Sequence, residues 1–333
     1  MTIAVPSPIH ENYPKKATAV SLYSPTPDDL AVPSPIHENY PKKATAVSLY
    51  SPTPDDLAML KRLTGINDET KLKEHVLRVQ TEAYEVYPYP CIAWFQFISY
   101  RISNYPFYNS ILTIGKERPG AIYADLGCCF GNDGRRVIAD GYPMENVVLS
   151  DLQGGFAELA HKLYQTTPDT YPVPFLAGDI FDPTFLSPQN LTSKKSSRNL
   201  KPPVLKDLKT LSPLRGHVSI IHAAWLFHLF GELKQRQLAS LLASLLSPLP
   251  GSMIVGSHLD LPDTEGNKKG GFRWSDKEMM VFAHSPTSWR ALWEDIFGTG
   301  KVRIESWVGQ WKSPWATSGG PERYLHTWKV TRL

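Results

Sequence analysis

The sequence predicts an α/β fold in which a mainly parallel sheet is covered by helices on both faces. From residue 121 onward, short apolar runs alternate with segments of helical length, and strands joined by such helices pair in parallel. A glycine loop follows the first apolar run. The last two apolar runs have no long helix between them, so the seven-stranded sheet should end in an antiparallel strand.

Composition and charge narrow the class of protein. The 333 residues are 42% hydrophobic and 20% charged, which is typical of a globular protein with a sizeable core. The formal net charge is only +3, and the one basic cluster, Lys194, Lys195 and Arg198, lies in a Ser- and Pro-rich stretch. We therefore expect no nucleic-acid partner.

The three cysteines and the N-terminus suggest a location. Cys128 and Cys129 are adjacent, and the cysteines lack the spacing of a disulfide framework or a zinc site. We expect no metal. The N-terminus does not resemble a signal peptide, and no apolar run approaches the roughly 18 residues of a membrane span. The expectation is a cytoplasmic protein without a membrane span.

The first 57 residues contain a tandem duplication, because residues 4–30 and 31–57 are identical. Each copy carries five prolines, which oppose helix interiors and central strands. We expect residues 1–57 to be largely disordered and one copy to be dispensable. The alternatives are a proline-rich docking tail or an artefact of the gene prediction.

Residues 58–118 should form a helical region, since apolar residues recur at helical spacing through 60–66 and 72–79. An aromatic stretch at residues 87–97 follows. It is either aromatic core between helices or a lid over an apolar substrate, and in the second case Tyr87, Tyr89 and Trp94 would contact the substrate.

Residues 119–333 carry the alternating pattern of the main domain. The predicted strands are residues 121–124, 146–150, 173–176, 217–222, 251–257, 302–307 and 324–331. The predicted helices are residues 135–141, 156–164, 233–246 and 287–297. Residues 185–211 are rich in Ser, Lys and Pro and should form a surface excursion.

The loop after the first strand carries an acid, Asp125, two positions before the first glycine. Its glycines fall at 127, 131 and 134, which differs from the G-x-G-x-x-G spacing of dinucleotide-binding loops. This spacing disfavours a nicotinamide dehydrogenase. An acid at the end of the first strand suits a ligand with an ammonium group, and S-adenosylmethionine (SAM) has one.

Two further acids follow the next strands. Asp151 ends the second strand and could accept both ribose hydroxyls of a nucleotide. Asp179, after the third strand, could accept from the adenine amino group, with Phe181 facing the ring. Because ligands of such sheets bind at the carboxyl ends of successive strands, the three acids together predict a nucleoside-containing cofactor.

These residues resemble the class I SAM-dependent methyltransferases, which have a Rossmann-like sheet. More narrowly, the chain is similar to fungal methyltransferases of secondary metabolism, including those of meroterpenoid clusters. The resemblance covers roughly residues 58–333. The matching segments are residues 87–92, 125–131 with Asp133 and Arg135, Asp151, residues 178–181 and residues 226–230.

The resemblance implies a cofactor site. The region around Asp125 and Gly127 would hold the methionyl end of SAM, Asp151 the ribose, and Asp179 with Ile180 the adenine. The full expected set is Asp125, Gly127, Cys128, Gly131, Asp133, Arg135, Asp151, Leu152, Asp179, Ile180, Phe181 and His222. The chain departs from the family pattern at Cys129, at Gly134 and in residues 153–156 (Gln-Gly-Gly-Phe).

The acceptor decides whether a base is needed. A carboxylate acceptor is already ionised at neutral pH, whereas a phenol or alcohol benefits from a base such as histidine. His222 and His228, after the fourth strand, are the catalytic candidates, and each could instead be a buried, satisfied histidine. Trp225, His258 and Trp311 are expected on the substrate side.

The sequence therefore predicts SAM-dependent O-methylation of a small apolar secondary metabolite, with a carboxylate acceptor favoured over a phenol. One alternative uses the same fold for cyclisation or rearrangement without methyl transfer. Another is a regulatory protein that senses SAM without catalysis. The oligomeric state, a homodimer included, stays open.

Overall fold

The computed structural model describes residues 47–187, 203–264, 272–273, 280–311 and 323–333. The predictions for residues 1–46 of the duplication and for the basic cluster at 194–198 lie outside the described residues. The described chain forms two compact units, one up to His222 and the other from Ala223 onward. Each unit is described separately below.

The predicted sheet is confirmed. Seven strands form one sheet in the order β3-β2-β1-β4-β5-β9-β8. β1 pairs in parallel with β2 and β4, and β2 with β3, whereas β9 runs antiparallel to β5 and β8. A small unpredicted sheet pairs β6 with β7. The strands are β1 (Ile122–Leu126), β2 (Val147–Asp151), β3 (Phe175–Ala177), β4 (Val218–His222), β5 (Met253–Asp260), β6 (Phe272–Arg273), β7 (Met280–Val281), β8 (Val302–Gln310) and β9 (Tyr324–Arg332).

In the first unit the region predicted to be helical is helical, with short 3-10 turns. A capping box between Thr53 and Asp56 starts its first long helix, and Gly65 ends that helix in a left-handed conformation. The α-helices are α3 (Pro54–Thr64), α4 (Glu69–Val86), α5 (Pro90–Ala93), α6 (Tyr108–Glu117), α7 (Asn132–Ala139) and α8 (Gly155–Tyr164). The 3-10 turns are η1 (Val47–Leu49), η2 (Gln96–Ile98), η3 (Arg101–Asn104), η4 (Met144–Asn146), η6 (Leu205–Asp207) and η7 (Ser212–Leu214).

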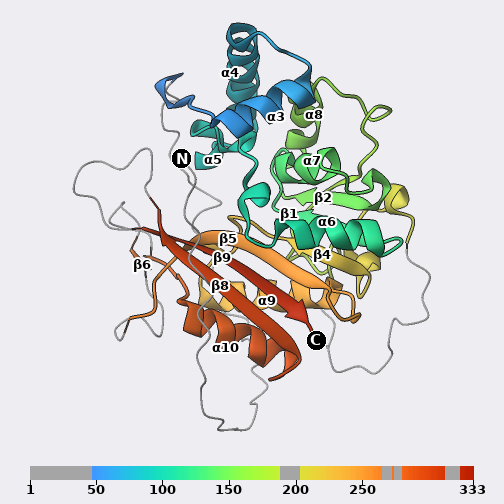
Figure 1. Cartoon of the computed structure of the whole chain (residues 1–333), viewed down its shortest axis with the longest axis vertical. Helices are drawn as coiled ribbons and strands as arrows, with labels where there is room; N and C mark the ends of the chain where they lie inside the picture. Colours follow the sequence, from blue (N-terminus) through green and yellow to red (C-terminus); the bar gives the residue numbers. More distant parts are fainter. Residues whose placement is uncertain (1–46, 188–202, 265–271, 274–279, 312–322) are drawn as a thin grey trace. The chain divides into compact units, whose positions relative to one another are not determined.

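The N-terminal helices of this unit pack on α8, as Figure 1 shows for α3 and α4. The buried face of α4, including Leu72 and Val76, joins Phe156 and Leu163 of α8 in one apolar cluster. Polar contacts add to this packing, because the buried Asp56 accepts a hydrogen bond from the backbone N–H of Tyr100 at 2.8 Å. The helical region is thereby fixed against the segment that follows β2.

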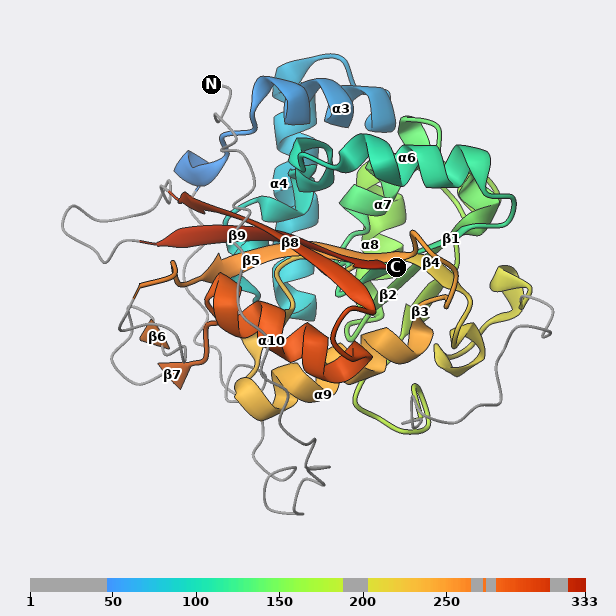
Figure 2. The ribbon, with the colours of Figure 1, turned by 60° about the horizontal axis from the view of Figure 1, so that its bottom comes forward.

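In the second unit, α9 (Glu232–Leu245) and α10 (Pro286–Phe297) lie on one side of β5, β8 and β9, as Figure 2 shows. The turn η8 (Phe227–Leu229) precedes α9. Trp289, Trp293 and Trp328 are fully buried there, with ring centroids 4.8–6.3 Å apart. These tryptophans form the core of the unit.

Two strands extend three residues beyond their predicted ends. β5 continues beyond residue 257 to Asp260, so that His258 lies inside the strand and pairs with His326 of β9. β8 continues beyond residue 307 to Gln310, so that most of the segment 307–311 is strand and not a connecting loop. Both extensions form because β9 continues its hydrogen bonding beside them.

No helix in the described parts of the chain has the length and apolar character of a membrane span.

Candidate functional site

The glycine loop joins β1 to α7 in a tight turn with glycine at both ends. Gly127 and Gly131 have φ values of 69° and 65°, in the left-handed region that favours glycine. The backbone N–H groups of Gly127 and Cys128 both donate to the carbonyl of Ser150 in β2, at 2.9 and 3.1 Å. The loop is therefore held against β2, beside the end of that strand.

Asp125 anchors the start of α7. Its Oδ2 accepts a hydrogen bond from the backbone N–H of Gly134 at 3.1 Å, and its side chain is almost completely buried. A Cβ on Gly134 would lie 2.6 Å from Leu149 Cδ2 and 3.5 Å from Asp125 Oδ2. Glycine at position 134 thus allows the helix to approach β2 and its N–H to reach Asp125.

His222 forms a hydrogen bond with the other oxygen of Asp125. Its Nδ1 donates to Asp125 Oδ1 at 2.8 Å, and its Nε2 lies 3.4 Å from the hydroxyl of Tyr105. Burial alone would lower the pKa of His222, but the charge and hydrogen bond of Asp125, with the charge of Asp133, raise it above its usual value. His222 is 1% exposed, so it is a buried partner of Asp125.

Asp151 ends β2 with its carboxylate turned towards the glycine loop. Its Oδ2 accepts from the backbone N–H of Cys129 at 2.8 Å, and its Oδ1 from that of Gln153 at 3.0 Å. Burial raises the pKa of Asp151 to about 6. Each oxygen retains a lone pair, so the carboxylate can accept two further hydroxyl donors. Leu152 beside it is 41% exposed, an apolar surface next to the carboxylate.

Asp179 lies in the turn that follows β3. It is exposed, and its Oδ1 accepts from the backbone N–H of Phe181 at 2.9 Å. Ile180 and Phe181 are half-buried. The backbone N–H of Gly178 donates to the carbonyl of Asp151 at 3.0 Å, which connects this turn to the end of β2.

Asp133 and Arg135 on α7 contact other parts of the protein and not the strand ends described above. Asp133 Oδ1 accepts from the backbone N–H of Ile102 at 3.0 Å, and burial raises its pKa to about 6. The Arg135 guanidinium lies 4.3 Å from the ring centroid of Tyr164 and 3.6 Å from that of Tyr171. These contacts connect α7 to its neighbours, and we leave both residues out of the ligand set proposed below.

The aromatic stretch of the first unit contributes Tyr87, Tyr89 and Trp94, all half-buried. The rings of Tyr87 and Tyr89 are 4.2 Å apart, and the ring of Tyr89 lies 6.0 Å from that of Phe156 in α8. Tyr89 therefore lies at the segment that follows Asp151.

The second unit brings together three other residues predicted from the sequence. The Trp225 ring lies 5.4 Å from the His228 ring and 5.6 Å from the Trp311 ring, each in an edge-on arrangement. Trp225 has a φ of 52°, which is unusual for a bulky residue. Its backbone N–H donates to the carbonyl of Ser257 at 2.7 Å. This group forms an aromatic cluster around one histidine.

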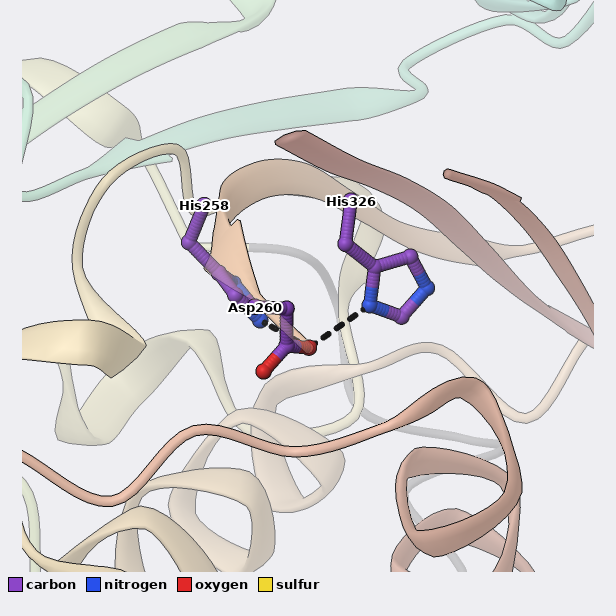
Figure 3. Close-up of side chains that lie close together, drawn as sticks. All are labelled: His258, Asp260 and His326. Carbon is purple, nitrogen blue, oxygen red and sulfur yellow. Dashed lines mark hydrogen bonds and ion pairs between the residues drawn. The ribbon is translucent and has the colours of Figure 1, made fainter. Parts of the chain in front are cut away.

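His258 lies elsewhere in the second unit, in the buried cluster that Figure 3 shows with Asp260 and His326. Asp260 Oδ2 lies 3.2 Å from His258 Nε2 and 2.8 Å from His326 Nδ1. Burial lowers the pKa of His258 to about 3 and raises that of Asp260 to about 6. With a pKa of about 3, His258 stays neutral at physiological pH.

The same three side chains offer ligand atoms within 4.8 Å of one another, the spacing of a metal site. However, the Trp328 indole, which can only donate, donates to His258 Nδ1 at 3.1 Å. In a neutral imidazole the proton is then on Nε2, where it donates to Asp260. A metal at Nε2 would require both ring nitrogens to be deprotonated, so the cluster is better described as a hydrogen-bond network.

The structure also identifies residues that the sequence analysis did not assign to the site. Tyr105 contacts His222, Gly134 donates to Asp125, and Gln153 donates to Asp151. The departures from the family pattern at Gly134 and Gln153 were the only local signals. Nothing local connects Tyr105 with His222, which is 117 residues away in sequence.

Comparisons with known proteins identify similar chains. Residues 48–98 match the family model described as the meroterpenoid methyltransferase N-terminal domain. The chain is 30% identical over 265 residues to the Asnovolin E/Chermesin D methyltransferase nvfJ of Aspergillus novofumigatus, which covers 79% of this chain and 83% of that protein.

Two other proteins are similar to the chain. It is 29% identical to the O-methyltransferase phiE of a fungal species, over 67% of this chain and 64% of that protein. A solved structure of an S-adenosylmethionine dependent methyltransferase from Mesorhizobium loti is 17% identical, with a TM-score of 0.40, over 69% of this chain and all of that one. The identity and coverage shared with nvfJ place this chain in the family of fungal SAM-dependent methyltransferases of secondary metabolism.

Proposed function

We propose that this SAM-dependent methyltransferase methylates an oxygen of a small apolar secondary metabolite, and that the oxygen belongs to a carboxylate. The observation that carries the proposal is that both ring nitrogens of His222 already have hydrogen-bond partners, so His222 is a poor general base. Both of its ring nitrogens face buried partners, Asp125 and Tyr105. A carboxylate acceptor needs no general base, because it is ionised at neutral pH.

The cofactor is assigned to the strand ends of the first unit. Asp151 would accept the ribose hydroxyls, the loop at Asp125 and Gly127 would hold the methionyl end, and Asp179 with Ile180 would hold the adenine. The chemistry of Asp151 fits this role, since it is a buried carboxylate with backbone N–H partners and lone pairs to spare. Hydroxyl donors would compensate the burial of its charge.

When bound, SAM supplies an activated methyl group, and the protein has to orient the acceptor and exclude water. The half-buried aromatic side chains Tyr87 and Trp94 of the first unit suit an apolar acceptor. A relative, phiE, is named an O-methyltransferase, which favours oxygen as the acceptor atom.

His228 is the base candidate for the competing phenol acceptor. Its ring lies against Trp225, in the aromatic cluster of the second unit. His258 is a poorer candidate, because burial lowers its pKa to about 3 and its two nitrogens face Trp328 and Asp260.

The test pairs apolar carboxylic acids with phenols of the same skeleton. Wild-type protein and His228→Asn are incubated with SAM carrying a labelled methyl group, and products are analysed by mass spectrometry before and after mild alkaline hydrolysis. We expect a labelled methyl ester that hydrolysis removes, formed equally by both proteins. A hydrolysis-resistant ether whose formation requires His228 would overturn the carboxylate proposal, and a product without the label would favour rearrangement.

A further inference from the structure

The segment of residues 99–105 is hydrogen-bonded to the start of α7, the helix that follows the glycine loop. The side-chain amide of Asn132 donates to the carbonyl of Ser99. Asp133 Oδ1 accepts from the backbone N–H of Ile102 at 3.0 Å. Asn132 and Asp133 are the first two residues of α7, so the segment has a fixed position beside the glycine loop.

Tyr105 ends this segment, and hydrogen bonds on both sides fix its backbone. Its N–H donates to the carbonyl of Ile102 at 3.1 Å, and its carbonyl accepts from the N–H of Tyr108 at 3.0 Å, where α6 begins. Its ring lies 5.9 Å from the ring of His222, and its hydroxyl lies 3.4 Å from His222 Nε2. Tyr105 is thus held with its hydroxyl at the end of β4.

The register of the sheet places this hydroxyl next to the start of the glycine loop. His222, the last residue of β4, pairs with Asp125 of β1, and Gly127 follows two residues later in the chain. His222 Nδ1 donates to Asp125 Oδ1 at 2.8 Å. Only the His222 ring therefore separates the Tyr105 hydroxyl from the carboxylate of Asp125, which we have assigned to the methionyl end of SAM.

The charge of His222 decides in which direction the Tyr105 hydroxyl donates. Burial lowers the pKa of His222, but the charge and hydrogen bond of Asp125 and the charge of Asp133 raise it above its usual value. The rings of Tyr105 and Tyr123 also lie against His222, the second with its centroid 6.3 Å away. In the imidazolium form both ring nitrogens donate, so Nε2 donates to the Tyr105 oxygen. The Tyr105 hydroxyl then donates its proton to an acceptor other than His222.

The methionyl end of SAM requires such a donor, because it carries a carboxylate as well as an ammonium group. Asp125 and Asp151 suit the ammonium group and the ribose hydroxyls, but their negative charges would repel a carboxylate. A tyrosine hydroxyl that accepts from an imidazolium has the opposite character, and hydrogen bonds to an ionised acceptor are the stronger ones. The acids and the hydroxyl together suit both charges of the methionyl end.

We propose that Tyr105 binds the methionyl carboxylate of SAM, donating from its hydroxyl while its oxygen accepts from His222 Nε2. Tyr105, His222 and Asp125 together form what we call the carboxylate clamp. This inference rests on the proposed cofactor site at the glycine loop, and it adds to that site a residue that the sequence analysis did not assign. His222 acts through Tyr105 as a positioning residue.

The experiment measures, by isothermal titration, binding of S-adenosylhomocysteine and of its analogue in which a hydrogen replaces the carboxylate. The variants are Tyr105→Phe and Asp151→Ala. Tyr108→Phe is the matched control, because it removes the hydroxyl of a nearby tyrosine that donates to Asp140 at 2.8 Å. Thermal unfolding of each variant verifies that it is folded.

We expect Tyr105→Phe to weaken binding of S-adenosylhomocysteine by about tenfold or more, the effect of one hydrogen bond to a charged group. Wild type and Tyr105→Phe should bind the analogue without the carboxylate equally, and Tyr108→Phe should bind both ligands like wild type. A purely structural role for Tyr105 would weaken binding of both ligands by the same factor, and that result would overturn the carboxylate clamp.

The clamp and the cofactor site fail in different ways. If Tyr105→Phe binds both ligands like wild type while Asp151→Ala loses affinity, the clamp is wrong and the cofactor site stands. If Tyr105→Phe instead weakens only the binding of an apolar carboxylic acid, the hydroxyl faces the acceptor, and the clamp is again wrong. If Asp151→Ala binds S-adenosylhomocysteine like wild type, the proposed cofactor site itself is wrong, and the clamp with it.

Discussion

His222 donates a hydrogen bond from Nδ1 to Asp125 Oδ1 across a distance of 2.8 Å, between the last residue of β4 and the penultimate residue of β1. The other oxygen of Asp125 accepts from Gly134 at the start of α7. One carboxylate therefore connects two adjacent parallel strands with the helix after the glycine loop. The acid that the sequence assigned to the ligand also fixes the shape of the loop.

The His222–Asp125 pair predicts a specific dependence of stability on pH. The pKa of His222 is raised in the folded state, so the pair stabilises most below the unfolded pKa, and this contribution disappears as pH rises through the folded pKa. Replacing His222 with Gln should reduce the free energy of unfolding by about 3–5 kcal/mol at low pH. Denaturation of both proteins from about pH 5 to about pH 9 measures this difference, which should shrink with rising pH. A difference that grows with pH would contradict the assignment.

The raised pKa of Asp151 predicts that cofactor affinity depends on pH. Its pKa is about 6 in the structure, and the ionised form is the stronger acceptor of hydrogen bonds from hydroxyls. Affinity for S-adenosylhomocysteine should rise with pH through about 6 and then level off. In Asp151→Asn, affinity should fall at least about tenfold and lose this rise. Asp133→Asn is the control, because Asp133 has a similar pKa and a different partner. A rise that persists in Asp151→Asn would contradict the prediction.

Gly134 should resist replacement although it lies in a helix. Alanine would gain about 1 kcal/mol of helix propensity, but its methyl would lie 2.6 Å from Leu149 Cδ2. We expect Gly134→Ala to lower the free energy of unfolding by about 1–3 kcal/mol. The loss should be smaller in a Leu149→Val background, which lacks the δ carbons. At Gly309 an added methyl meets nothing within 4 Å, so Gly309→Ala serves as the control. An equal effect of both alanine substitutions would rule out the steric explanation.

The sequence predicts features that are encoded by residues close together in the chain, and not contacts between distant residues. Asp125, Asp151 and Asp179 were placed at strand ends because a strand, a turn and a helix are encoded within a few residues of one another. The pairing of His222 with Asp125 joins residues 97 positions apart, and no local pattern encodes it.

The same limit explains why His258 was expected on the substrate side. Its polarity suggested a position after the strand and near a ligand. The structure buries it between Trp328 and Asp260, and Asp260 also contacts His326, 66 residues away. Buried polar residues that satisfy one another resemble functional residues until their partners are known.

The hydrogen bond from Trp328 to His258 predicts unequal effects of two tryptophan substitutions. Both Trp328 and Trp293 are fully buried, but in the described part of the chain Trp293 Nε1 has no hydrogen-bond partner. Trp328→Phe should leave His258 Nδ1 unsatisfied and cost about 1–3 kcal/mol more than Trp293→Phe in chemical denaturation. Equal losses would show that the hydrogen bond contributes nothing.

The duplicated N-terminal segment gives a simple prediction. Every residue of the proposed cofactor site lies beyond residue 86, whereas residues 4–30 repeat a sequence that is retained in 31–57. Deleting residues 4–30 should leave SAM affinity and turnover unchanged. Reduced turnover with intact SAM binding would instead assign the first copy a role with the acceptor or a partner.

Isothermal titration of the full chain with SAM, compared between wild type and Asp151→Ala, tests the central claim most directly. The account predicts saturable binding to wild type at one site per chain. It also predicts a loss of affinity in Asp151→Ala, while thermal unfolding shows that the variant remains folded. Wild-type affinity in a folded Asp151→Ala variant, or no binding of SAM to wild type, would contradict it.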